Sequence, residues 1–210
     1  MASLLTQPML LVALSLLALY LVFLWWYGGK GAPLSAAEVE AFKRAVAPNL
    51  QDPASQHLLD EIDALVANDD GREFVMQNLV RHRPKALYPP GHHYSDDPRE
   101  ADRRYGRSIT WPLLRYGNLP IWIARRAGNF IEPEGADAWH YVAMVRYRSR
   151  RDFLRFALAS EKKNNFIHKW AAIEKTHVFP VQPLISLVFV RGMVGMALAL
   201  LGVAVGGWLR

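Results

Sequence analysis

The chain has 210 residues, a formal net charge of +6 and no cysteine. The lack of cysteine excludes disulfide bonds, thiolate nucleophiles and cysteine-based metal sites. The charge is unevenly distributed: residues 30–70 hold three basic and eight acidic residues, whereas residues 71–183 hold twenty basic and eleven acidic ones, so an acidic arm precedes a basic domain.

Residues 4–27 form an apolar run that predicts a transmembrane helix. At about 1.5 Å per residue the run reaches roughly 36 Å, enough to cross a bilayer core of about 30 Å with some tilt. Trp25, Trp26 and Tyr27 suit the headgroup layer. No basic residue precedes the run and no small-residue cleavage site follows it, which favours a retained anchor over a cleaved signal peptide or a buried core helix.

Residues 28–70 are predicted to form a linker followed by a helical arm without catalytic chemistry. Ser35 and Glu38 have the spacing of a capping box, which predicts a helix that ends before Pro48. Asp52 and Pro53 predict the start of a second helix, which stops in the polar residues 68–71.

Residues 71–183 alternate between strand-like and helix-like patterns. We expect strands at 72–83, 118–131, 139–147 and 176–181. A helix is expected from Asp97 and Pro98 toward Leu114, bent or ended by Pro112, and further helices at 150–160 and 165–173. The order β-α-β-β-α-β is that of the ferredoxin-like fold, so the predicted class is α+β.

Three features of this region carry a resemblance: Asn78 in the first strand, the pair Tyr105 and Gly106 in the first helix, and the turn from the third strand into the second helix. The turn contains Arg146, Tyr147, Ser149, Arg150 and Phe153. With these features, residues 71–183 resemble a family of uncharacterised bacterial proteins in the dimeric α+β barrel superfamily. The resemblance implies a homodimer that forms through the sheet, with a barrel interior that can hold a small lipophilic molecule. Some members of that superfamily are cofactor-independent isomerases or oxygenases, but a shared fold does not transfer an activity.

The candidate catalytic residues are His82 and His140. His82 ends the first strand, where it can act as a general base near neutral pH while Arg81 holds an anionic substrate, or where it is simply a solvated strand end. His140 begins the third strand, and it either converges with His82 inside a barrel or faces solvent at an edge.

Four residues are candidate ligand-binding residues: Asn78, Arg81, Tyr105 and Arg146. A buried Asn78 either orients a ligand or only satisfies backbone groups. Tyr105 is expected to pack the helix against the sheet in preference to donating a proton. The surrounding basic cluster is expected to be solvated or to face lipid; it comprises Arg146, Arg148, Arg150, Arg151 and Arg155.

The loop with His92, His93, Asp96 and Asp97 invites a metal site, but adjacent histidines cannot both point inward without a special loop, and Asp97 is needed as a helix cap. We therefore expect no metal. No nucleotide-binding or hydrolase motif occurs, so no cofactor is expected, and no nucleic-acid-binding signature accompanies the basic charge.

Residues 184–209 predict a second transmembrane helix with one charged residue, Arg191. It either starts at Gly192 with Arg191 at the interface, which costs little, or starts near Leu184 and buries Arg191. Gly202 and Gly206 form a GxxxG pair that either admits another membrane helix or faces lipid. The distribution of Lys and Arg places residues 28–183 in the cytoplasm of a two-pass protein of the bacterial inner membrane.

The sequence therefore predicts a membrane-anchored α+β barrel protein that binds a small lipophilic molecule and contacts membrane lipid. Whether it is an enzyme stays open. The alternative is a non-catalytic accessory or assembly subunit that meets other membrane subunits through its C-terminal helix.

Overall fold

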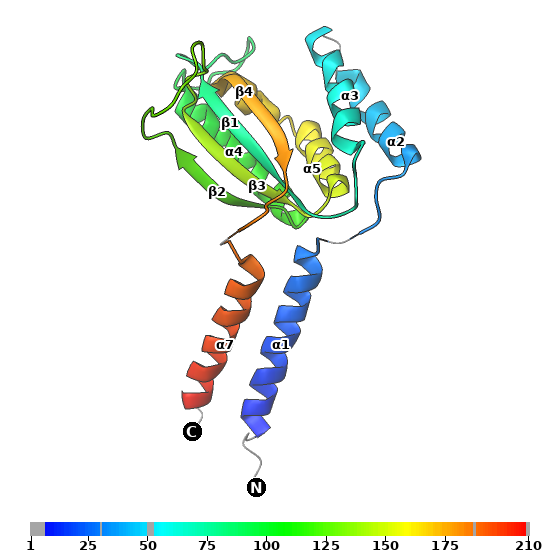
Figure 1. Ribbon diagram of the computed structural model, residues 1–210, viewed down its shortest axis with the longest axis vertical. Coiled ribbons are helices and arrows are strands. Elements are labelled where there is room, and N and C mark those ends of the chain that lie inside the picture. Colours follow the sequence, from blue (N-terminus) through cyan, green and yellow to red (C-terminus); the bar gives the residue numbers. More distant parts are fainter. Residues whose placement is uncertain (1–6, 30, 50–52, 187, 209–210) are drawn as a thin grey trace. The chain divides into compact units, whose positions relative to one another are not determined.

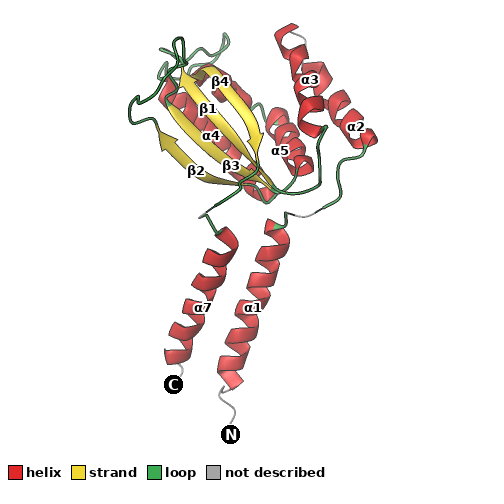
Figure 2. Cartoon of the chain, in the orientation of Figure 1, coloured by secondary structure: helices red, strands yellow, loops and turns green. Residues whose placement is uncertain are grey.

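The computed structural model describes residues 7–29, 31–49, 53–186 and 188–208. The chain divides into two compact units: Met1–Gly28 with Leu184–Arg210, and Gly29–Pro183. The second unit contains the predicted arm together with the predicted domain. Figures 1 and 2 show its mixed α+β architecture.

The domain is built on a four-stranded antiparallel sheet. Its strands are β1 (Phe74–His82), β2 (Leu119–Arg125), β3 (Tyr141–Tyr147) and β4 (Ile173–Val181), in the order β2-β3-β1-β4. All four strands were predicted from their alternating patterns. The second and third strands are shorter than predicted, and the fourth begins three residues earlier than predicted.

Helices α4 (Pro98–Arg115), α5 (Arg150–Lys162) and α6 (Phe166–Ala172) complete the domain. Figure 1 shows α4 behind the sheet and α5 to its right in this view. Phe74 and Met76 of β1 point to this side and form a buried core with Leu113 of α4, Tyr147 of β3 and Phe156 of α5. Burying such a side chain is worth about 1.5–3 kcal/mol, so this cluster fixes the helices on one face of the sheet.

Pro112 does not end α4, contrary to one of the two predicted outcomes, because its structural cost is compensated. A proline lacks the N–H that would bond to the carbonyl four residues earlier, here that of Ser108. The side chain of the buried Asn165 donates to this carbonyl, with 3.2 Å between Nδ2 and O. The helix therefore continues to Arg115.

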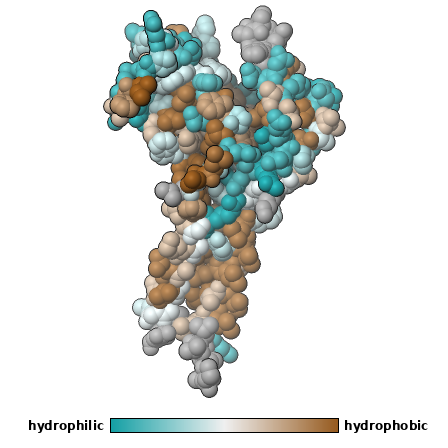
Figure 3. All heavy atoms as spheres, in the orientation of Figure 1, coloured by the Kyte–Doolittle hydropathy of each residue, from teal (hydrophilic) through white to brown (hydrophobic). Residues whose placement is uncertain are grey.

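The opposite face of the sheet carries half-buried apolar side chains. Residues that alternate with the core-facing ones are Leu79 on β1, Val142 and Met144 on β3, and Phe179 on β4. Trp122 of the edge strand β2 is 52% exposed. Figure 3 shows hydrophobic side chains gathered over this side of the sheet.

The arm consists of α2 (Ala36–Val46), a 3₁₀ turn (Ala47–Asn49) and α3 (Pro53–Val66). The predicted capping box is present: Ser35 Oγ accepts from the Glu38 backbone N–H and the Glu38 carboxylate accepts from the Ser35 N–H. The predicted cap Asp52 lies outside the described residues. Leu65 of α3 packs against the core cluster, so the arm is part of the same packed body as the sheet.

The prediction that the basic cluster at 146–155 is solvated or lipid-facing is wrong for its buried members, because Arg146 and Arg150 are only 3% and 7% exposed. Arg150 pairs with Asp69 and donates to the Leu65 carbonyl at 2.8 Å. Arg151 donates to the carboxylate of Glu38 at 2.7 Å. The groups that bind Arg150 and Arg151 therefore lie in the arm, far from these two arginines in the sequence.

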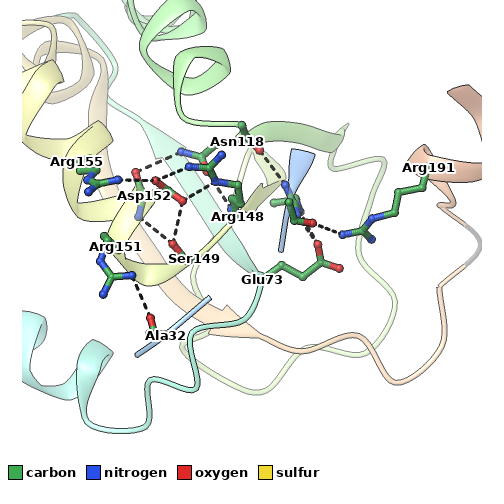
Figure 4. A network of polar contacts seen from close by, with 12 residues as sticks. Ala32, Glu73, Asn118, Arg148, Ser149, Arg151, Asp152, Arg155 and Arg191 are labelled. Carbon is green, nitrogen blue, oxygen red and sulfur yellow. Dashed lines mark hydrogen bonds and ion pairs between the residues drawn. The ribbon is translucent and has the colours of Figure 1, made fainter. Parts of the chain in front are cut away.

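Asp152 is the centre of the polar network drawn in Figure 4. It is 4% exposed. Its carboxylate accepts from Arg148 Nε at 2.7 Å and from Ser149 Oγ at 2.9 Å, and Ser149 in turn caps α5. The side chain of Asn118 accepts from the Arg148 backbone N–H at 3.0 Å. The network therefore fixes the turn from β3 into α5.

The first unit contains α1 (Gln7–Tyr27) and α7 (Val190–Trp208), each long and apolar enough to cross a membrane. Residues 4–6 and Leu209 of the predicted spans lie outside the described residues. Arg191 lies in the first turn of α7, where it donates to the Gly28 carbonyl at 2.6 Å and stacks over the Tyr27 ring at 4.6 Å. The helix therefore begins close to the later of the two predicted starts.

Glycines of α7 face α1. A Cβ placed on Gly195 would lie 3.2 Å from the Tyr20 ring, and one placed on Gly202 would lie 3.1 Å from Leu16 Cδ1. The small residues thus allow close contact between the two helices of the same chain.

Candidate functional site

His82 lies at the end of β1, where the regular strand pairing is interrupted. The register of β1 against β4 shifts between Arg81 and His82, which marks a β-bulge or similar irregularity. The extra residue is Glu174 of β4, so His82 keeps the alternation of β1 and shares a face with Asn78 and Val80. The His82 ring lies on the helix side of the sheet, and its side chain is 13% exposed.

Asp102 of α4 and Tyr141 of β3 complete a hydrogen-bonded group with His82. His82 Nε2 lies 3.1 Å from Asp102 Oδ2, and the Tyr141 hydroxyl donates to Asp102 Oδ1 at 3.2 Å. A carboxylate only accepts hydrogen bonds, so the proton of the neutral imidazole is on Nε2 and Nδ1 is its basic nitrogen. The group therefore has the orientation of a histidine general base held by a carboxylate.

His140 lies next to His82, and it is exposed, as in the predicted alternative of a solvent-facing position. The rings stack with centroids 5.5 Å apart, and His140 Nδ1 accepts from the His82 backbone N–H at 2.8 Å. Burial, together with the nearby His82, Arg99 and Arg81, lowers the pKa of His140. The lowered pKa favours the neutral form of His140, whose Nδ1 holds the backbone at the end of β1.

Tyr105 and Lys169 interact electrostatically with Asp102. Burial, and secondarily Asp102, raises the pKa of Tyr105, so its hydroxyl keeps its proton. Burial lowers the pKa of the Lys169 ammonium to about 8, although Asp102 opposes the shift. Lys169 Nζ lies 4.7 Å from the centre of the Trp170 ring. The surroundings of Asp102 thus combine an imidazole, protonated phenols and an amine whose pKa is about 8.

Arg81 points away from this group. Its guanidinium pairs with Asp137 at 3.3 Å and with Glu174 at 3.1 Å, and Lys175 pairs with the same Asp137 at 2.6 Å. Its charge is therefore matched by carboxylates of the protein, which leaves less positive potential for an anionic substrate.

Asn78 faces the helix side, and its amide donates to the backbone carbonyls of Met76 at 3.0 Å and Ala143 at 3.2 Å. Arg146 lies near the other end of the sheet, where it pairs with Glu73 and donates to the Gly117 carbonyl at 2.8 Å. The structure thus brings together His82 and His140, whereas Tyr105 packs against Phe166 of α6 and Arg81 and Arg146 pair elsewhere.

The loop with the adjacent histidines forms an aromatic cluster. His92 stacks on Tyr94, and the Tyr88 hydroxyl lies 3.0 Å from His168 Nδ1. Among the described residues there is no group of three or more His, Asp or Glu side chains that can hold a metal ion.

Asp102, Tyr141 and Lys169 were not identified from the sequence. Asp102 did carry a signal: with Tyr105, Ile109 and Leu113 it follows the helical spacing of the inward face of α4, where a carboxylate is unusual. Tyr141 and Lys169 carried none, because a tyrosine in a strand and a lysine in a helix are ordinary.

A separate apolar groove lies between α1 and α7. It has a volume of about 620 Å³ and is lined by residues that include Met9, Leu16, Leu198, Gly202 and Gly206. This groove belongs to the helical pair and not to the domain that contains His82.

No family model and no curated protein matches the chain. Two solved structures are similar to it: the methylated RPA0582 protein, and the RPA0582 protein of unknown function from Rhodopseudomonas palustris. Each is 27% identical with a TM-score of 0.54. The first match covers 61% of this chain and 93% of that chain, and the second covers 60% and 94%. These similarities fit an uncharacterised family with a small antiparallel sheet, and they assign no activity.

Proposed function

We propose that the chain is a membrane-anchored protein whose α+β domain binds a small lipophilic molecule and moves a proton on it, as a cofactor-independent isomerase or oxygenase would. The observation that carries the proposal is the convergence of His82, Asp102 and Tyr141 between the sheet and α4. His82 removes the proton through Nδ1, and Asp102 stabilises the imidazolium that results. Tyr105 stays protonated and is suited to donate a hydrogen bond to the developing oxyanion.

The proposed fold is ferredoxin-like, and the proposed oligomer is a homodimer formed through the sheet. The element order β-α-β-β-α-β and the antiparallel order β2-β3-β1-β4 support the first part. The apolar open face with Leu79, Val142 and Met144 supports the second, because a second copy would remove this surface from water.

The proposed location is the inner membrane of a bacterium, with α1 and α7 as two spans and the domain in the cytoplasm. Length and apolar composition of both helices support the anchoring. The cytoplasmic side rests on the lysines and arginines that flank the spans on the domain side. A bilayer would supply a lipophilic ligand at high local concentration.

Native mass spectrometry of the full chain in mild detergent tests this function. A homodimer that carries a small organic molecule is expected, with the molecule lost in His82→Gln and Asp102→Asn. Lys85→Gln is the matched control, since Lys85 is 76% exposed and pairs only with Asp96 among the described residues.

Two results would contradict the proposal. A homodimer that never carries a small molecule would remove the ligand-binding role. Foreign membrane subunits that co-purify in fixed ratio would instead support the accessory-subunit function.

A further inference from the structure

Helix α4 presents one row of exposed residues that the proposed site does not use. Positions four apart on a helix are neighbours on its surface. The row comprises Arg99, Arg103, Arg107, Trp111 and Arg115, all of them exposed. It extends over about 24 Å and winds around the helix by about 40° per step, so Arg103, Arg107 and Trp111 lie within about 80° of one another at its centre. We call it the α4 arginine row.

The positive charge of the row is largely unmatched. Arg103 lies 3.9 Å from Asp97, an exposed and distant pair that contributes little. No ion pair of Arg99 or Arg107 occurs among the described residues. The two acidic residues within α4 are used elsewhere: Glu100 pairs with Arg104, and Asp102 holds His82. The row therefore presents a strip of positive potential to its surroundings.

Trp111 gives the row an apolar component, with 67% of its surface exposed. An exposed tryptophan beside arginines suits a headgroup layer, where the ring is partly in apolar surroundings and the guanidinium groups bind phosphates in a bidentate manner. Each arginine close to an anionic leaflet favours the bound state by about fivefold.

We propose that the α4 arginine row docks on anionic phospholipid headgroups. The inference rests on the membrane anchoring in the proposed function: the domain is part of the same chain as α1 and α7, so a membrane that holds these helices is a permanently available partner. The chemistry of recognition is phosphate by arginine, and the lipid is an anionic one such as phosphatidylglycerol. A free nucleic acid would need to compete with this tethered surface.

A single-cysteine probe can test the docking, because the chain has no cysteine of its own. Gly106 is exposed beside the row, and a Cβ there would meet no atom within 4 Å. The Gly106→Cys chain is labelled with an environment-sensitive fluorophore and reconstituted in nanodiscs of phosphatidylcholine, with or without phosphatidylglycerol. Ala37→Cys, exposed in the acidic arm, is the control label position.

Docking predicts that acrylamide quenching of the label at 106 falls at least twofold in anionic discs, but not in neutral discs or at high salt. The label at 37 should not respond. Adding Arg103→Glu and Arg107→Glu should abolish the protection, whereas the charge-matched pair Arg72→Glu and Arg125→Glu should preserve it.

The proposal is overturned if quenching at 106 is equal in both lipids, or if the control pair abolishes protection as fully as the row pair. It is also overturned if a single-stranded oligonucleotide protects the label in neutral discs while phosphatidylglycerol does not. A chain that stays in the aqueous fraction without detergent would instead refute the membrane anchoring itself, which separates the two failures.

Discussion

Replacing Gly71 by alanine should destabilise the domain more than the same change at Gly91. Both glycines have a left-handed backbone, with φ of +70° and +89°. An alanine there costs about 1–2 kcal/mol at either position. At Gly71 the added Cβ would also lie 2.1 Å from the Gly31 carbonyl oxygen, whereas at Gly91 it would meet no atom within 4 Å.

The overlap at Gly71 adds about 1–3 kcal/mol, because the linker backbone must move away. For a chain of this size an extra 2 kcal/mol lowers the melting temperature by about 4–8 °C. Thermal unfolding of both full-length variants, followed by circular dichroism in one detergent, measures the difference. Trypsin cleavage at Lys43 and Arg44 of the arm should also become faster in Gly71→Ala. Equal melting temperatures for the two variants would show that Gly31 does not contact Gly71.

Three further outcomes are expected from thermal or chemical unfolding. Asn165→Ala leaves the Ser108 carbonyl without its donor and should cost about 1–3 kcal/mol. In a Pro112→Ala background, which restores the backbone N–H, the same change should cost less, and full additivity would disprove the compensation. Asp152→Ala should lower the free energy of unfolding by about 2 kcal/mol. This is less than the roughly 3–5 kcal/mol lost when a fully buried ion pair is broken, because the arginine partners of Asp152 are partly exposed. A variant with the wild-type melting temperature would show that the network adds no stability. Folding lowers the pKa of His140, so the folded protein disfavours the protonated imidazole. The contribution of His140 to the free energy of unfolding is therefore fully present above about pH 6.5 and is lost as the pH falls below that value. His140→Asn should therefore lose less stability than wild type between pH 7.5 and 5.5, and an unchanged pH dependence would contradict the assignment.

The strands and helices of the domain were predictable because their patterns are local. Alternation along residues 74–80 separates a core face from an open face, and this alternation is what the structure displays. The Ser35 and Asp97 caps were predictable for the same reason, since each needs only the residues that follow it. Helix continuation through Pro112 was not, because the compensating Asn165 lies 53 residues further along the chain.

Of the residues in the hydrogen-bonded group around Asp102, only His82 and His140 were named from the sequence. Their convergence depends on the register of β1 against β3, which places Val80 opposite Tyr141 and so brings His82 next to His140. Alternation along β1 sends the neighbours His82 and Arg81 to opposite faces of the sheet, where His82 meets Asp102 and Arg81 meets Asp137 and Glu174. A strict alternation of side chains gives no information on which carboxylates will be within reach.

The two groups of arginines differ in their partners, and this difference separates structural charge from available charge. The arginines at 146–155 follow one another closely in sequence, yet carboxylates of the arm and of Asp152 neutralise most of them. The arginines of α4 are spread over residues 99–115, and they form a row that winds slowly around the helix because four residues make slightly more than one turn. Clustering in sequence was therefore misleading for the buried Arg146 and Arg150, whereas helical spacing together with the ion pairs of the described residues supports the α4 arginine row as the proposed docking surface.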